Sequence, residues 1–217
     1  MWGNASRAMP TGVTRLGPVK GTGEARSLKI GSVRKFTPSS CTRKVECPTQ
    51  VREGRARFSF SAEIEGLRIH AVPVQHWSQR IPFVVNRTSW AGFIVEGRNG
   101  KLLFPGDTGY SSDFKDIHER MGPMTLALLP IGAYQPRWFM HSMHIGPQEA
   151  VQIHKDLHSK LSVAMHWGTF ALTDEPFDEP PQLLRETLKA ANIPESEFWI
   201  MGHGETRWLD SVWPRPE

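Results

Sequence analysis

The chain has 217 residues, of which 39% are apolar and 22% charged, a composition typical of a globular protein of one domain or slightly more. No run of about 18 apolar residues occurs, so a membrane-spanning helix is not expected. Two cysteines, Cys41 and Cys47, are too few for a disulfide scaffold or a four-cysteine zinc site. Because the sequence shows no apolar core of a secretory signal, we expect both cysteines to be reduced thiols.

The net charge of +4 divides unevenly along the chain. Residues 1–57 carry twelve Lys and Arg against three Glu, net +9, which leaves residues 58–217 with a net charge of −5. Because the first segment also lacks apolar periodicity, we predict a disordered basic leader, 1–57, ahead of a folded domain, 58–217. A mitochondrial transit peptide and an electrostatic contact with nucleic acid or anionic lipid are alternatives. A solvated tail is preferred, and no nucleic-acid partner is expected.

Strands and helices are predicted to alternate from residue 56 onward. Short segments that alternate apolar and polar residues, or are wholly apolar, are predicted to be strands: 56–63, 67–74, 90–96, 101–104, 125–131, 161–165 and 198–201. Segments with apolar residues at helical spacing are predicted to be helices: 112–121, 147–158 and 181–191. The fold class expected for the chain is α+β, which the family resemblance given below implies.

Three of the predicted apolar strands run directly into residues that can bind a metal. His76, Asp107 and His166 each follow the end of one such strand. Neighbouring strands that end together would place the three side chains along one edge of a sheet. Two imidazoles and a carboxylate suit zinc, so a metal site is one hypothesis. Ordinary loop residues at the three positions are the alternative.

Other histidines give weaker signals. His154 and His158 lie four residues apart on one predicted helix and would both face a metal there. The preferred interpretation is that His154 lies on the half-buried stripe of the helix. His158 would lie near the helix C-terminus, where a positive charge is favourable. His141 and His144 lie in a segment interpreted as loop. His144 stands just before the helix that begins at Pro147, where helix N–H groups favour an anion such as phosphate.

Several longer motifs resemble one enzyme family. They are PVQHWSQR (73–80), FPGDTGY (104–110), LLPIGAYQPRWFMHSMHIGPQEAVQIH (128–154), AMHWGTFAL (164–172) and HGETR (203–207). In this order and with similar gaps, they resemble N-acyl-phosphatidylethanolamine-hydrolysing phospholipase D, a family of the metallo-β-lactamase superfamily, over residues 67–209. The resemblance implies an αββα sandwich. This chain would carry its C-terminal half, behind the basic leader.

The resemblance also implies a site with two zinc ions. The family's metal ligands fall on His76, Asp107 and His166, with Asp107 bridging both ions, and a catalytic histidine near the substrate phosphate falls on His144. Two zinc ions neutralise the charge of a phosphodiester and lower the pKa of bound water towards about 7. The implied reaction releases N-acylethanolamine from an N-acylated ethanolamine phospholipid and leaves phosphatidic acid.

The family's His-x-His-x-Asp-His motif, which supplies four further ligands, does not occur in the 217 residues. One zinc ion or none is therefore expected, and the chain alone is expected to be inactive. The implied partner is a phospholipid at a membrane surface. The expected localisation is cytoplasmic and peripheral to membranes, and the basic leader makes a mitochondrial localisation the alternative. Uncovered apolar faces would favour a homo-oligomer. The alternatives are a non-catalytic lipid- or partner-binding remnant, and the same fold acting on another substrate.

Overall fold

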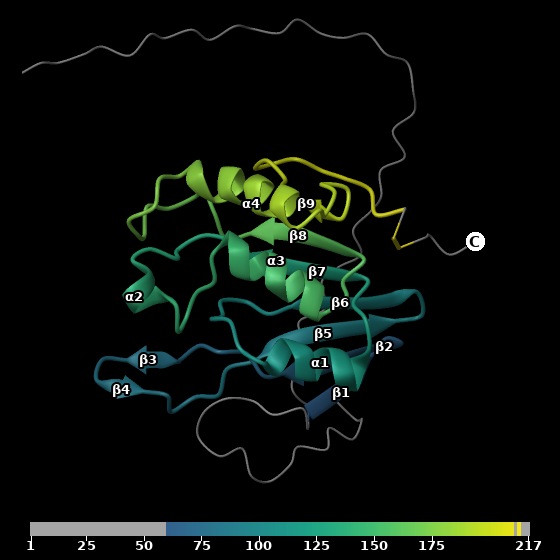
Figure 1. Ribbon diagram of the computed structural model, residues 1–217. Coiled ribbons are helices and arrows are strands. Elements are labelled where there is room, and N and C mark those ends of the chain that lie inside the picture. Colours follow the sequence, from purple (N-terminus) through teal and green to yellow (C-terminus); the bar gives the residue numbers. More distant parts are fainter. Residues whose placement is uncertain (1–59, 211, 214–217) are drawn as a thin grey trace, which may run out of the picture. The chain divides into compact units, whose positions relative to one another are not determined.

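The computed structural model describes residues 60–210, 212 and 213. The predicted leader, both cysteines and the first part of the strand predicted at 56–63 lie outside the described residues. A seven-stranded sheet runs through the described part of the chain, with strand order β1-β2-β5-β6-β7-β8-β9 (Figure 1). Its strands are β1 (Phe60–Ile64), β2 (Leu67–Val72), β5 (Gly92–Gly97), β6 (Gly100–Phe104), β7 (Leu126–Pro130), β8 (Leu161–Met165) and β9 (Phe198–Trp199).

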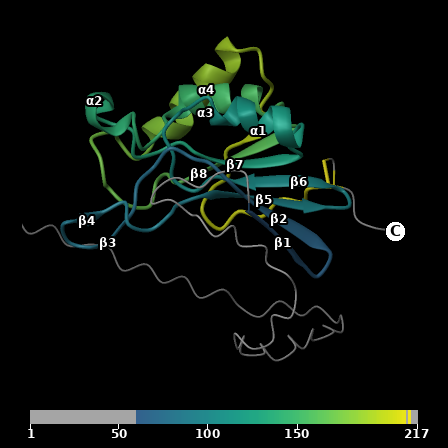
Figure 2. The ribbon, with the colours of Figure 1, turned by 90° about the horizontal axis from the view of Figure 1, so that it is seen from below.

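The sheet is mixed, and its two halves need different connections. β1, β2, β5 and β6 pair antiparallel, so tight turns join β1 to β2 and β5 to β6. β6, β7, β8 and β9 pair in parallel, which requires a crossover between each strand and the next. Helices α1 (Asp113–Met121), α3 (Pro147–Asp156) and α4 (Glu179–Ala190) lie in these three crossovers. Figure 2 shows all three helices on one face of the sheet.

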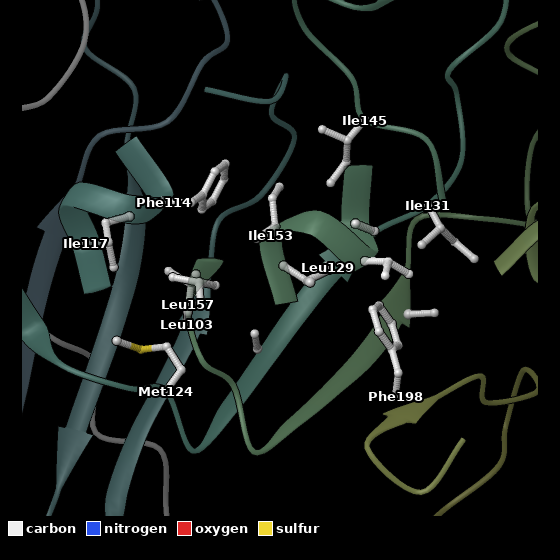
Figure 3. Packing of buried hydrophobic residues seen from close by; sticks show 14 of the residues in the cluster. Leu103, Phe114, Ile117, Met124, Leu129, Ile131, Ile145, Ile153, Leu157 and Phe198 are labelled. Atoms are coloured by element: carbon white, nitrogen blue, oxygen red, sulfur yellow. The ribbon is translucent and has the colours of Figure 1, made fainter. Parts of the chain in front are cut away.

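The core lies between this helical layer and the sheet (Figure 3). Leu103 and Leu129 from the strands meet Phe114 and Ile153 from α1 and α3, and all four side chains are fully buried. Burying a side chain of this size stabilises the fold by about 1.5–3 kcal/mol. The central strands β7 and β8 are buried over most of their length, and each helix buries one apolar stripe, so apolar runs and helical spacing were useful signals in the sequence.

The opposite face of the sheet is also apolar. Phe93 on β5 and Phe104 on β6 are direct cross-strand partners, and they remain 44% and 43% exposed. Within the described residues, the chain therefore forms one large sheet covered by one layer of helices, which is half of the αββα sandwich that the resemblance implied. Every helix among the described residues is too short or too polar to span a lipid bilayer.

The predicted strands and helices that fall within the described residues are present, with ends shifted by a few residues. Three further elements were not predicted. β3 (Gln79–Ile81) and β4 (Val84–Val85) form a separate two-stranded sheet, and the helix α2 (Arg137–Met140) lies in the segment interpreted as loop. The reason is physical, because β3 is exposed throughout and α2 has one turn, so neither shows an apolar period.

Candidate metal centre

Strand direction brings three of the predicted ligands to one edge of the sheet. β2 and β6 both run antiparallel to β5, so they share one direction, and β7 and β8 run parallel to β6. The carboxyl ends of β2, β6 and β8 therefore lie at the same edge. His76, Asp107 and His166 follow these three ends. This placement agrees with the sequence analysis, whereas the roles of the residues as metal ligands stay predictions.

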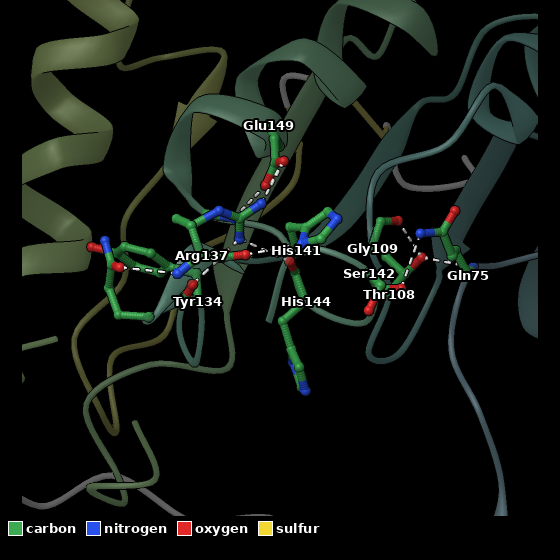
Figure 4. A network of polar contacts seen from close by, with 11 residues as sticks. Gln75, Thr108, Gly109, Tyr134, Arg137, His141, Ser142, His144 and Glu149 are labelled. Carbon is green, nitrogen blue, oxygen red and sulfur yellow. Dashed lines mark hydrogen bonds and ion pairs between the residues drawn. The ribbon is translucent and has the colours of Figure 1, made fainter. Parts of the chain in front are cut away.

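Gln75 ties the segment that carries His76 to its neighbours. Its backbone forms an isolated antiparallel bridge with Gly109, in which the Gly109 N–H donates to the Gln75 carbonyl over 2.7 Å. The Gln75 N–H donates to Thr108 Oγ1 at 3.0 Å, and the side-chain amide donates to the Ser142 carbonyl at 2.9 Å. Figure 4 shows this cluster. One residue thus connects the segments of His76 and Asp107 to the segment that leads into His144.

His144 is held through its backbone by a guanidinium. Arg137 Nη1 donates to the His144 carbonyl at 3.1 Å and to the Tyr134 carbonyl at 3.4 Å, and Arg137 Nη2 pairs with Glu149 Oε1 at 2.7 Å. Glu149 lies in the first turn of α3, and its other oxygen accepts the Gly146 N–H at 2.9 Å. The His144 ring extends away from Arg137 (Figure 4). The ring therefore remains free to face the other candidate ligands.

His166 lies at a tight backbone crossing. Its φ is +60°, in the left-handed region that non-glycine residues rarely adopt. Gly132, at the end of the neighbouring strand, approaches so closely that a Cβ there would lie 2.3 Å from the His166 carbonyl oxygen. The Ile131 N–H also donates to the Met165 carbonyl at 3.0 Å. Glycine at position 132 is therefore required for the two strand ends to meet in this way.

Four side chains converge at this edge. One donor atom each from His76, Asp107 and His144 lies within 4.8 Å of the others, which is the spacing of a group able to hold a metal ion. His166 Nε2 lies 3.3 Å from Asp107 Oδ1. The His144 ring centroid lies 5.4 Å from that of His76 and 5.7 Å from that of His166. The structure therefore places His144 as close to the centre as the three strand-end residues.

The donor atoms fit a metal ion. His76 Nε2 and His144 Nδ1 are buried and have no hydrogen-bond partner, a costly arrangement that a bound cation would relieve. His76 Nδ1 lies 3.0 Å from the Trp77 carbonyl, and because a carbonyl only accepts, Nδ1 carries the proton. His76 Nε2 is then left with an unshared electron pair. A backbone partner on the other ring nitrogen is the usual arrangement of a metal-ligating histidine.

Burial keeps the His144 imidazole neutral. It lowers the pKa of the imidazole below the ordinary value of 6.5, His76 and His166 lower the pKa further, and the charges of Asp107 and Glu175 oppose this. An imidazole must be unprotonated to bind a metal, so a lowered pKa favours binding at neutral pH. The donor set of imidazole nitrogens and a carboxylate oxygen is one that zinc accepts.

The remaining candidate histidines lie apart from this centre. His154 is buried, and its Nδ1 lies 2.9 Å from Ser162 Oγ. His158 stacks on His118, with ring centroids 4.2 Å apart. His154 and His158 thus have separate partners and do not face a common ion, in agreement with the preferred interpretation. His141 is exposed, and its Nδ1 lies 2.9 Å from the Arg137 carbonyl.

Sequence reasoning missed the residues that support the ligands. Three residues each contact the backbone of another segment, and no local sequence pattern predicts such contacts: Gln75, Arg137 and Gly132. One signal was available, because all three lie inside motifs that resemble the phospholipase family.

A cavity of about 280 Å³ opens beside His166. Its walls come mainly from the segment after β8, residues 167–178, including Phe170, Leu172 and Phe177. Glu175 is the charged residue of this segment that lines it. The site therefore combines a polar centre with an apolar cavity, as small-molecule sites commonly do.

The profile of the beta-lactamase superfamily domain matches residues 25–167, and the chain belongs to this family. The match begins inside the segment that the sequence analysis separated as a leader. Over 142 residues, the chain is 42% identical to N-acyl-phosphatidylethanolamine-hydrolyzing phospholipase D 1 of Caenorhabditis elegans, a match that covers 64% of this chain and 40% of the worm protein. The mitochondrial N-acyl-phosphatidylethanolamine-hydrolyzing phospholipase D of Saccharomyces cerevisiae is 44% identical over 119 residues, covering 54% of this chain and 25% of the yeast protein.

The chain thus spans less than half the length of these two relatives. A further relative, a UPF0173 metal-dependent hydrolase of Methanopyrus kandleri, is 32% identical over 146 residues, covering 66% of this chain and 57% of that protein. Among solved structures, a metallo hydrolase from Ignicoccus hospitalis superposes with a TM-score of 0.51 at 23% identity, over 69% of this chain and 57% of that one. An isothiocyanate hydrolase from Delia radicum gut bacteria superposes with a TM-score of 0.52 at 18% sequence identity, over 67% of this chain and 55% of that one. These two likenesses establish the fold.

Proposed function

We propose that this chain contributes to a zinc-dependent phosphodiester hydrolase of the N-acyl-phosphatidylethanolamine phospholipase D type. The observation that carries the proposal is the convergence of His76, Asp107, His144 and His166, with unpaired ring nitrogens on His76 and His144. Similarity to the worm and yeast phospholipases over the same part of the chain supports the choice of substrate. The mixture of imidazole and carboxylate donors supports zinc.

In this proposal, His76 Nε2 and Asp107 hold the ion, together with His144 or His166. A bound zinc ion supplies Lewis-acid polarisation of the phosphoryl group. Asp107 also orients His166, because one of its two oxygens lies 3.3 Å from His166 Nε2. His144 is unprotonated near neutral pH, so it either binds the ion or accepts a proton at the substrate. Arg137 takes no part in binding phosphate, because Glu149 and backbone carbonyls already occupy its guanidinium.

The four ligands of the His-x-His-x-Asp-His motif are absent from this sequence. A catalytic zinc site needs three protein ligands and an open position, and the family uses two ions. We therefore expect one weakly held ion per chain and no turnover by the chain alone. Turnover is expected when a second polypeptide supplies the motif.

An apolar rim supports a lipid substrate at a membrane surface. We define it as the exposed apolar side chains of three segments: Ile81, Phe83, Val85, Trp138, Phe139, Phe170, Leu172 and Phe177. The β3–β4 hairpin follows His76, α2 precedes His144, and residues 167–178 follow His166. Figures 1 and 2 both place the β3–β4 hairpin and α2 at the same end of the sheet. Clustered exposed aromatic side chains of this kind favour an interface with lipid.

The decisive experiment measures product release from vesicles that contain N-acyl-phosphatidylethanolamine. The zinc-loaded chain is assayed alone and with the first half of the Caenorhabditis elegans relative, and N-acylethanolamine and phosphatidic acid are quantified. Release in the mixture that Asp107→Asn abolishes, while Asp116→Asn on the exposed face of α1 leaves it intact, would support the proposal. Absence of release from every mixture, despite bound zinc, would contradict it. Turnover of a soluble phosphodiester alone would shift the substrate class.

A second candidate function is a lipid-binding module without catalysis. The combination of an exposed apolar rim with missing ligands favours it. This candidate predicts vesicle binding that is indifferent to zinc and to Asp107→Asn. Vesicle binding that requires zinc would favour the hydrolase.

Localisation at membrane surfaces follows from the proposed substrate. We propose specifically that the protein is located in mitochondria. The printed name of the yeast relative includes the word mitochondrial, which supports this. Fluorescence imaging of the tagged full chain beside a mitochondrial marker tests this directly. A uniformly cytoplasmic signal would overturn the mitochondrial assignment.

A further inference from the structure

A carboxylate outside the metal centre binds three consecutive backbone N–H groups. Glu175 Oε1 accepts hydrogen bonds from the N–H groups of Ala133 and Tyr134 at 2.5 and 3.3 Å, and Glu175 Oε2 accepts one from Gln135 at 3.0 Å. Ala133 has a φ of +64°, a left-handed conformation of the kind that turns successive N–H groups towards one side. Such concave runs of backbone amides bind anions, and here the anion belongs to the chain itself.

Glu175 is held as an anion. Burial raises the pKa of its carboxyl group, but hydrogen bonds from Thr173 and from backbone N–H groups outweigh this and keep the pKa below its ordinary value. Hydrogen bonds to an ionised acceptor are roughly twice as strong as neutral ones. The contact is therefore a strong one for a segment that lies largely at the surface.

The bound amides connect to His144 through one side chain. Arg137 follows Gln135 by two residues, and its N–H donates to Gln135 Oε1 at 3.3 Å. The Arg137 guanidinium then donates to the carbonyls of Tyr134 and His144. Glu175, residues 133–135, Arg137 and the His144 backbone thus form an unbroken chain of polar contacts.

Glu175 also lies on the segment that begins just after His166. Both residues line the cavity beside the metal centre. The carboxylate of Glu175 therefore helps to fasten this segment to residues 133–135, alongside the Asp174 N–H, which donates to the Gln135 carbonyl at 3.5 Å. Loss of the Glu175 hydrogen bonds would weaken the link between two walls of the site.

We propose that Glu175 is a positioning residue that fixes His144 relative to the other three candidate ligands. It acts through its hydrogen bonds to the backbone of residues 133–135 and through Arg137. The proposal deepens the proposed function and rests on it where metal affinity is concerned. The positional effect on His144 is independent of any ion.

Amide hydrogen exchange on the full chain tests the positional effect. Glu175→Gln is expected to speed exchange about tenfold at Ala133, Tyr134 and Gln135, because hydrogen bonds to a charged group are lost. The Met143 and His144 amides, which donate to the Met140 carbonyl, are expected to exchange faster as well. Glu179→Gln is the matched control, because Glu179 accepts a hydrogen bond from the Tyr134 hydroxyl and from none of the three amides.

Faster exchange confined to residues 133–135 would overturn the proposal, because Glu175 would then hold only its own contact. If Glu175→Gln also loosens the core strand β8, Arg137→Lys replaces it, since lysine lacks the planar guanidinium that holds two carbonyls and Glu149 at once. Arg137→Lys is expected to speed exchange at Met143 and His144 and to leave residues 133–135 protected. Unchanged exchange at His144 in this variant would also overturn the proposal.

Cobalt(II) binding, measured by equilibrium dialysis, provides a second readout. Supporting contacts of this type typically change metal affinity by about tenfold, so we expect that loss in Glu175→Gln and no change in Glu179→Gln. Equal affinities in all three proteins would overturn the role of Glu175 at the centre. If the unmodified chain binds no cobalt, the proposed metal function fails, while the exchange experiment still decides the positional role.

Discussion

The Gly109 N–H donates to the Gln75 carbonyl over 2.7 Å, and this bridge joins the segments that carry Asp107 and His76. Gln75 directly precedes His76, and Gly109 follows Asp107 by two residues. Neither segment can slide past the other without breaking the bridge. The spacing of the two candidate ligands is therefore set by backbone contacts and does not depend on an ion.

Gly109→Ala is expected to damage this junction. The added Cβ would lie 2.7 Å from the Ser142 carbonyl oxygen, and backbone cannot move aside as easily as a side chain. Overpacking of this kind costs about 1–3 kcal/mol, which urea unfolding would measure. Gly202→Ala is the control, because the nearest atom to its Cβ, Glu205 Oε2, is 3.7 Å away. Equal stability of the two variants would show that the junction is more compliant than the structure indicates.

His144→Ala is expected to weaken zinc binding by at least about tenfold, and His141→Ala to leave it unchanged. His144 belongs to the group of three residues within 4.8 Å, whereas the exposed His141 ring faces the Arg137 carbonyl. Isothermal titration with zinc on both variants makes the comparison. If His144→Ala retains full affinity, His144 serves the substrate, and His166 completes the ligand set.

Stability is expected to fall in mild acid because of His154. Burial lowers the pKa of its imidazole to about 4 in the folded chain, against 6.5 for an exposed histidine. Between these values the unfolded chain binds the proton and the folded chain does not, so the free energy of unfolding decreases as the pH falls from about 6.5 to about 4. The full loss would be about 3 kcal/mol. His154→Gln should flatten this pH dependence in urea titrations, and His141→Gln should not.

The apolar rim is expected to bind lipid vesicles. Phe83 is 99% exposed and Trp138 is 80% exposed, so replacing both with serine removes apolar surface without opening a cavity. Cosedimentation with phosphatidylcholine and phosphatidylethanolamine vesicles should fall several-fold while the unfolding midpoint stays constant. Trp208→Ser is the control, because Trp208 is 74% exposed and lies in the segment after β9. An equal loss of vesicle binding in Trp208→Ser would contradict the prediction that the apolar rim is the lipid-binding surface.

Much of the candidate site could be predicted from the sequence, because three of its residues directly follow predicted strands. A largely apolar run such as 161–165 fits a buried parallel strand, and the polar residue that follows it is expected to emerge at the edge of the sheet. Because β6, β7 and β8 are parallel, this local rule placed Asp107 and His166 together. His76 joined them because β2 and β6 share a direction, a fact of topology that no local pattern contains.

The supporting contacts were not predictable from local patterns. Glu175 lies about forty residues from the amides it binds, and Arg137 reaches His144 through backbone carbonyls. Side chains that act on another segment's backbone impose no periodicity and no composition signal. The β3–β4 hairpin was missed for a related reason, since its exposed residues have no buried partner to enforce alternation.

Each segment of the apolar rim lies close in sequence to one candidate ligand. Phe83 follows His76 by seven residues, and Phe170 follows His166 by four. Within a single loop, the residue nearest the strand serves the centre, and the residues further out meet the surroundings. In the proposed function, recognition and chemistry would therefore use neighbouring residues of the same short loops. Exchanging the outer part of one loop would be expected to change what the protein approaches while the sheet edge keeps its donors in place.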